Sequence, residues 1–221
     1  MTDDLISLTL FTLSSILIVV NPIGAMLVYN SLTDTMDAGM KKRVAIHACQ
    51  LSTVVLLFFT LFGGNLLNLF GITIEAFTIA GGVLLFGIGM EMVYARTSRA
   101  KMTATEKYES IDAEEVSSMP LAFPMISGPG TITTVIVLAK DAPMQTEPLH
   151  LGMILLSVLF TMVLTYILFI SSDKFSHRIR QREYRVVNRL MGIMLMAIAV
   201  QFMINGISDA FPGLLSGPLV T

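Results

Sequence analysis

The sequence predicts an all-α membrane protein in which six transmembrane helices form two inverted three-helix repeats, with helices 1 and 4 discontinuous. Three observations predict this fold: the composition, the number of long apolar runs, and matching interruptions in the first and fourth runs. Of the 221 residues, 54% are hydrophobic and 14% are charged, and the mean hydropathy is +0.75. Soluble domains carry about 25% charged residues. Because a soluble core of this size cannot bury so much apolar surface, we expect the bilayer to be the solvent.

Six apolar runs are each near the ~20 residues that a helix needs to cross a bilayer. They cover residues 5–29, 44–63, 72–94, 119–139, 149–172 and 187–211. The first run follows an acidic start and is longer than the core of a signal peptide, so we interpret it as a retained span. The fourth run is the least regular, because it contains Pro120, Pro124 and Pro129.

The basic residues predict how the six helices are oriented. Three of the 14 lysines and arginines follow the first run, four follow the third, and six lie before or at the start of the sixth, which leaves only Lys140 on the opposite side. Cytoplasmic loops of membrane proteins carry such an excess of positive charge. We therefore expect a plasma (inner) membrane protein with both termini outside the cytoplasm, that is, periplasmic. The polar segment 96–118 is then a cytoplasmic linker between a first repeat, 1–95, and a second repeat, 119–221.

An odd number of spans on each side of the linker predicts that the two halves run in opposite directions across the membrane. The sequence offers modest support for such a repeat. Pro22 and Pro129, in the first and fourth runs, lie 107 positions apart. Aligning Gly82 with Gly192 in the third and sixth runs gives a spacing of 110 and places Glu91 over Gln201.

The interruptions are Asn21-Pro22-Ile23-Gly24 in the first run and Ser127-Gly128-Pro129-Gly130 in the fourth. Proline removes a backbone donor and glycine loosens the chain, and freed backbone groups are costly in hydrocarbon. Corresponding breaks in two halves indicate a transporter binding site, because freed N–H groups favour a carboxylate and freed carbonyls favour an ammonium group. Two such breaks could hold a zwitterion. The alternative is that each break is only a kink, which proline and glycine often cause in membrane helices.

The same segments resemble the MarC family, which includes SnatA-type transporters of small neutral amino acids such as glycine and alanine. The resemblance rests on "NPIGA" at 21–25, "FPMISGPGTI" at 123–132, "IAGG" at 79–82, and "RLMG" with "QFMINGI" near the C-terminus. It implies a six-helix transporter that exports these amino acids. By position, it implies substrate contacts at Asn21, Pro22, Ile23, Gly24, Ser127, Gly128, Pro129, Gly130 and Thr131.

Three further polar residues in the runs are candidates for coupling or gating: Glu91, Gln201 and Asn205. Glu91 has an alternative role as an interfacial partner of Arg96. The runs contain no carboxylate pair at a convincing depth, so the sequence does not support proton coupling. The three histidines and 16 methionines are scattered, which predicts no metal site and no cofactor. A net charge of −2 predicts no nucleic-acid partner.

We therefore expect a secondary transporter whose partners are a small neutral amino acid and the lipid bilayer, and whose two halves rock to expose the site alternately. The coupling ion and the oligomeric state are not assigned. The alternatives are a channel, or a membrane assembly protein without carrier activity. An enzyme is not expected, because no nucleophile–base pair, HExxH or GxSxG motif is visible.

Overall fold

A computed structural model describes residues 2–94, 116–140, 148–176 and 181–212. Within these ranges the chain forms seven α-helices and one π-helical segment, and no strand. The all-α prediction is therefore confirmed for this part of the chain. In order, the elements are α1 (Thr2–Val20), α2 (Pro22–Thr33), α3 (Ala38–Leu69), α4 (Ile74–Val93), η1 (Ser117–Ile126), α7 (Pro129–Lys140), α8 (Pro148–Ser176) and α9 (Gln181–Ala210).

Side-chain caps set where two of the long helices begin. Asp37 Oδ1 accepts hydrogen bonds from the N–H groups of Gly39 and Met40 at 2.7 and 3.0 Å, and α3 starts directly after it. Thr73 Oγ1 accepts a hydrogen bond from Ala76 N–H at 3.2 Å at the start of α4. Both caps satisfy N–H groups that a helix start leaves free.

Five helices in the described residues are long and apolar enough to cross a membrane, with α1 and α2 together counted as one. They are Ile6–Asn30, Ala38–Leu69, Ile74–Val93, Pro148–Ser172 and Arg189–Ala210. A sixth span results if η1 and α7, which meet at an angle of 50°, are taken as one broken helix. Large apolar side chains on the outside, such as Val54 and Leu156, suit contact with lipid.

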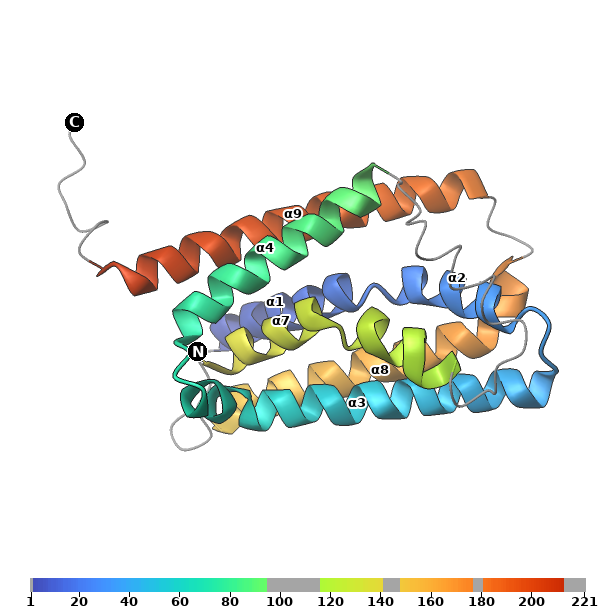
Figure 1. Cartoon of the computed structure of the whole chain (residues 1–221), viewed down its shortest axis with the longest axis horizontal. Helices are drawn as coiled ribbons and strands as arrows, with labels where there is room; N and C mark the ends of the chain where they lie inside the picture. The colour runs from blue at the N-terminus through green and yellow to red at the C-terminus, as the bar shows by residue number, and fades with distance from the viewer. Residues whose placement is uncertain (1, 95–115, 141–147, 177–180, 213–221) are drawn as a thin grey trace.

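The helices form three groups that lie side by side, with α4 inclined to α3 (Figure 1). α4 and α9 pack together on one side, and α3 and α8 pack together on the other. The pairs α1–α2 and η1–α7 lie between them and contact both groups. The largest hydrophobic cluster fills the space between the central helices and α3 and α8, whereas a second, smaller cluster joins α4 and α9 around Leu85 and Leu195.

Glycines bring α4 and α9 close together. A Cβ atom built on Gly82 would lie 2.7 Å from the carbonyl oxygen of Ala199, and one built on Gly89 would lie 2.9 Å from that of Gly192. Small residues at helix contacts permit such approach in membrane proteins. The two contacts also show that α4 and α9 run antiparallel.

The predicted linker, 96–118, lies mainly outside the described residues. Of its last three residues, Val116 is helical and 117–118 already belong to η1. The chain therefore returns to helix slightly before the predicted end of the linker.

Candidate functional site

The first break, defined as residues 21–24, separates α1 from α2 at one left-handed residue. Asn21 has φ 48° and ψ 65°, a conformation that asparagine adopts more readily than most residues. Its side-chain Oδ1 accepts a hydrogen bond from Gly24 N–H at 3.2 Å and so caps α2. Pro22 occupies the first position of α2, where a missing N–H is tolerated.

This geometry leaves backbone groups without their usual helical partners. The Ile18 carbonyl would normally accept from residue 22, which is proline, and the Val20 carbonyl would accept from Gly24 N–H, which binds Asn21 instead. Within the described ranges, neither carbonyl receives another backbone hydrogen bond. The end of α1 therefore presents unsatisfied acceptors inside a predicted span.

The second break, defined as residues 127–130, separates η1 from α7. η1 is irregular, with extended backbone at Met119 and Phe123 and a cis Phe123–Pro124 peptide bond. The Ala122 carbonyl accepts hydrogen bonds from the Ser127 N–H and hydroxyl at 2.9 and 2.8 Å, and lies 3.5 Å from Ser52 Oγ of α3. Ser127 thus closes the end of η1 with its own backbone and side chain.

At the start of α7, threonine hydroxyl groups also donate hydrogen bonds to backbone carbonyls. Thr131 Oγ1 donates to the Ile126 carbonyl at 2.9 Å, and Thr133 Oγ1 donates to the Pro129 carbonyl at 2.9 Å. No hydrogen bond from the N–H groups of Gly130 and Thr131 is found among the described residues. The second break therefore presents free donors at the N-terminal end of α7.

The two breaks lie at the same level of the bundle. α1, which precedes the first break, packs against α7, which follows the second, and α2 packs against η1. The first broken helix therefore contacts the second on both sides of its break. This places the two breaks beside each other near the middle of the bundle (Figure 1). The free carbonyls of α1 and the free N–H groups of α7 are thereby brought to one region.

The predicted substrate contacts differ in exposure. Pro22, Gly24, Ser127, Gly128, Gly130 and Thr131 are buried, Asn21 is half-buried, and Ile23 and Pro129 are exposed. Two contacts with α4, which the sequence did not indicate, join both breaks to that helix. Asn21 Nδ2 lies 4.0 Å from Met92 Sδ, and a Cβ built on Gly130 would lie 2.6 Å from Leu85 Cδ2.

Of the three candidate coupling or gating residues, Gln201 and Asn205 lie together, whereas Glu91 lies apart from them. Glu91 follows Gly89 on α4 and so lies near Gly192, whereas Gln201 follows Ala199 on α9 and lies near Gly82, toward the other end of the pair. Gln201 Nε2 donates instead to Asn205 Oδ1 at 2.7 Å. All three candidates are exposed on the chain.

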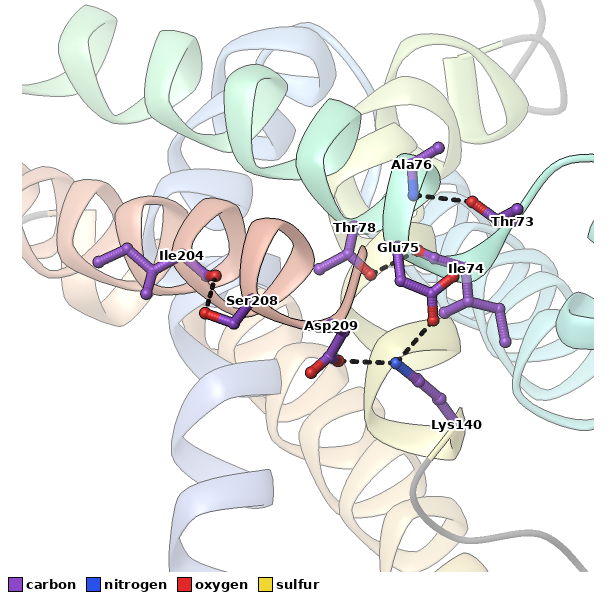
Figure 2. Close-up of polar contacts among 9 residues, drawn as sticks. All are labelled: Thr73, Ile74, Glu75, Ala76, Thr78, Lys140, Ile204, Ser208 and Asp209. Atoms are coloured by element: carbon purple, nitrogen blue, oxygen red, sulfur yellow. Dashed lines mark hydrogen bonds and ion pairs between the residues drawn. The ribbon is translucent and has the colours of Figure 1, made fainter. Parts of the chain in front are cut away.

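One charged cluster ties three helices together at one end of the bundle. Lys140 Nζ at the end of α7 lies 3.1 Å from Glu75 Oε1 of α4 and 2.8 Å from Asp209 Oδ2 of α9 (Figure 2). The basic-residue pattern singled out Lys140 alone, and it did not predict these ion pairs. We call Glu75, Lys140 and Asp209 the ion triad.

No group of three or more histidine, cysteine, aspartate or glutamate side chains that could hold a metal ion occurs within the described ranges. The one cysteine, Cys49, is buried and free.

Known proteins similar to this chain are membrane proteins. Residues 6–211 match the family described as MarC family integral membrane protein. The chain is 35% identical to a UPF0056 membrane protein of Methanocaldococcus jannaschii over 92% of this chain and 88% of the relative. It is 37% identical to one of Pyrococcus horikoshii (87% and 90%) and 34% identical to YhcE of Escherichia coli (89% and 90%). No solved structure matches the chain. The apolar helices and these matches together establish that the chain belongs to the MarC family of integral membrane proteins.

Proposed function

We propose that this protein is a secondary transporter that exports small neutral amino acids such as glycine and alanine. The zwitterion binds between the two breaks, and the site is exposed alternately to the two sides of the membrane. The observation that carries the proposal is the meeting of the breaks at one level, which follows from the packing of α1 on α7 and of α2 on η1.

The chemistry of the helix ends supports a zwitterionic substrate. The N–H groups of Gly130 and Thr131 at the start of α7 carry partial positive charge and suit a carboxylate. The carbonyls of Ile18 and Val20 at the end of α1 carry partial negative charge and suit an ammonium group. Gly24, Gly128 and Gly130 add no side chain around these groups, which suits a substrate with a small side chain.

Contacts between α4 and α9 support the proposal that the halves are inverted repeats. With the alignment that places Gly82 on Gly192, Gly89 falls on Ala199. When each residue is exchanged for its aligned counterpart, the contact of Gly82 with Ala199 is converted into a contact of Gly192 with Gly89. Both contacts are present. A pair of helices related by a twofold axis has this property.

The helices α3 and α8 support the same repeat. α3 carries Ser52, Leu56 and Thr60 at four-residue spacing, and α8 carries Ser157, Thr161 and Thr165 at the same spacing, 105 positions later. All six are buried. α3 packs on η1 and α7, whereas α8 packs on α1 and α2, so each helix lies against the broken helix of the other half.

We propose the orientation that the basic residues indicate, with both termini outside the cytoplasm of a plasma (inner) membrane. α1 begins and α9 ends at the end of the bundle that holds the ion triad (Figure 1). A Cys49→Ala background allows single exposed cysteines to report the side. We expect Asn68→Cys to react with a membrane-impermeant maleimide in intact cells, and Lys42→Cys to react only after permeabilisation. The reverse pattern would overturn this orientation.

The transport proposal is tested with purified protein in proteoliposomes and with radiolabelled glycine and alanine. We expect binding and uptake by the wild type, and loss of both in Gly24→Val and Gly130→Val. Valine at position 24 would displace the Asn21 cap, and valine at 130 would push α7 away from Leu85. Gly152→Val is the matched control, because a Cβ at Gly152 meets no other atom within 4 Å.

Two results would refute the transport proposal. One is failure of the folded wild type to bind any small neutral amino acid. The other is normal transport by both Gly24→Val and Gly130→Val, which would show that the breaks are only kinks. Unitary currents in planar bilayers would assign the protein to the channels instead, since a carrier gives none.

A further inference from the structure

We infer that Thr161 of α8 is a further substrate-binding residue, and that its hydroxyl oxygen accepts a hydrogen bond from the ammonium group of the amino acid at the first break. This inference rests on the proposed function and adds a residue that comes from a third element of the site. Three observations about Thr161 carry it: its unsatisfied hydroxyl, its direction, and its level in the bundle.

Thr161 differs from its neighbours on α8 in how its hydroxyl is used. Ser157 Oγ donates to the Met153 carbonyl at 2.8 Å, and Thr165 Oγ1 donates to the Thr161 carbonyl at 2.7 Å. Thr161 itself has 0% exposure, yet its Oγ1 has no hydrogen-bond partner among the described residues. Buried polar atoms are nearly always paired, so this atom calls for a partner that the described part of the chain does not supply.

The direction of Thr161 follows from two contacts on either side of it. Thr9 Oγ1 of α1 donates to Met153 Sδ at 3.3 Å, and the ring of Tyr29 of α2 stacks on Phe169 at 4.5 Å. Met153, Thr161 and Phe169 are spaced eight residues apart. In an α-helix, a step of eight residues rotates the side-chain direction about the helix axis by two full turns and about 80° more. Thr161 therefore points between the directions of the residues that contact α1 and α2.

The level of Thr161 matches the first break. Thr161 is midway along α8 between Met153 and Phe169, and the residue midway between their partners Thr9 and Tyr29 is Val19. Val19 lies two residues before the break. The unpartnered hydroxyl is therefore placed beside the part of α1 where the carbonyls of Ile18 and Val20 are free.

These groups together match one end of an amino acid. An ammonium group has three N–H donors and no acceptor. The Thr161 oxygen and the two free carbonyls supply three acceptors, whereas the free N–H groups at the start of α7 remain for the carboxylate. Since a hydrogen bond to a charged group is stronger than a neutral one, its loss lowers affinity by about tenfold or more.

The experiment measures equilibrium binding of radiolabelled glycine to full-length protein in nanodiscs. Thr161→Val removes the hydroxyl with little change in shape, and we expect its Kd to rise about tenfold or more. Thr161→Ser keeps the hydroxyl and should bind like the wild type. Thr165→Val is the matched control, because Thr165 has the same burial, lies one turn away and bonds only its own helix.

The outcomes separate this inference from the function on which it rests. If the wild type binds glycine and Thr161→Val binds it as tightly as Thr165→Val does, Thr161 is a packing residue and the inference is wrong. If no small neutral amino acid binds the folded wild type, both proposals are refuted. If Thr161→Val does not fold, Thr161→Ser and Thr161→Ala decide, and equal affinity in these two variants would overturn the inference.

Discussion

The side chain of Asn21 reaches forward to the backbone of Gly24 and accepts its N–H at 3.2 Å. This single contact caps α2 while Asn21 itself holds the left-handed conformation that turns the chain between α1 and α2. A larger residue at position 24 would displace this cap, because a Cβ there would meet the Asn21 amide. The two residues therefore form one local unit.

Substitution of Asn21 should lower stability in a defined order. Asn21→Gly keeps the left-handed conformation and loses only the side-chain cap, at a cost of a few tenths of a kcal/mol. Asn21→Ala loses the cap, about 1 kcal/mol, and also strains the left-handed residue by roughly 1–2 kcal/mol. Thermal unfolding in detergent, followed by far-ultraviolet circular dichroism, measures the order. The control is Asn65→Ala at an exposed position of α3. An alanine variant as stable as the glycine variant would contradict this account.

Gly128→Ala should disturb the second break. A Cβ at position 128 would collide with the carbonyl oxygen of Pro124, which is backbone and cannot turn aside. Overpacking of this kind costs about 1–3 kcal/mol. Gly152→Ala, where the new methyl group meets no other atom within 4 Å, should be neutral or slightly stabilising. Equal melting temperatures for the two variants would show that the second break tolerates a side chain.

The contact between α4 and α9 gives a matched pair on one helix. Gly89→Ala would place a methyl group 2.9 Å from the Gly192 carbonyl, whereas a Cβ at Gly87 meets no other atom within 4 Å. We expect Gly89→Ala to lower the melting temperature and Gly87→Ala to leave it unchanged or raise it slightly. The rate at which a protease cleaves α4 reports on the same contact. This rate should rise in Gly89→Ala and stay unchanged in Gly87→Ala.

The ion triad should contribute little to stability, and its contribution should depend on salt. Its side chains are 26–53% exposed, and exposed ion pairs contribute about 0.2–1 kcal/mol each. A double-mutant cycle of Lys140→Gln with Asp209→Asn measures the coupling energy. We expect it to fall when the ionic strength is raised, because screening weakens exposed pairs. Lys140→Arg, which keeps the charge, should preserve the coupling, and a coupling unaffected by salt would contradict the expectation.

Local chemistry explains what the sequence could predict. The spans follow from hydropathy, and the first break follows from Pro22, whose missing N–H acts at its own position. The helix ends were less well predicted. Hydropathy predicts the second span at 44–63, whereas α3 extends over Ala38–Leu69 because the Asp37 cap starts the helix before the charged residues 41–43. Hydropathy detects the part of a helix that lies in lipid, not the turns that project beyond it.

Packing explains what the sequence could not predict. Pro129 predicts the start of α7, since proline is favoured at the first helical position. The irregular η1 depends instead on contacts across helices, such as the approach of Ser52 to the Ala122 carbonyl. Thr161 shows the same limit. Nothing in its neighbourhood along the chain distinguishes it from Thr165, and only the structure shows that one hydroxyl is paired and the other is not.

The division of the interior into two hydrophobic clusters bears on how the chain could be divided. The smaller cluster joins Leu85 of α4 to Leu195 of α9, one helix from each side of the predicted linker. A cut through that linker would therefore give two fragments, each carrying one helix of the α4–α9 pair and one helix of the α3–α8 pair. Neither fragment would have a complete interior by itself, whereas the two fragments expressed together could restore it. Each half of the chain therefore completes its hydrophobic interior only by packing against the other half.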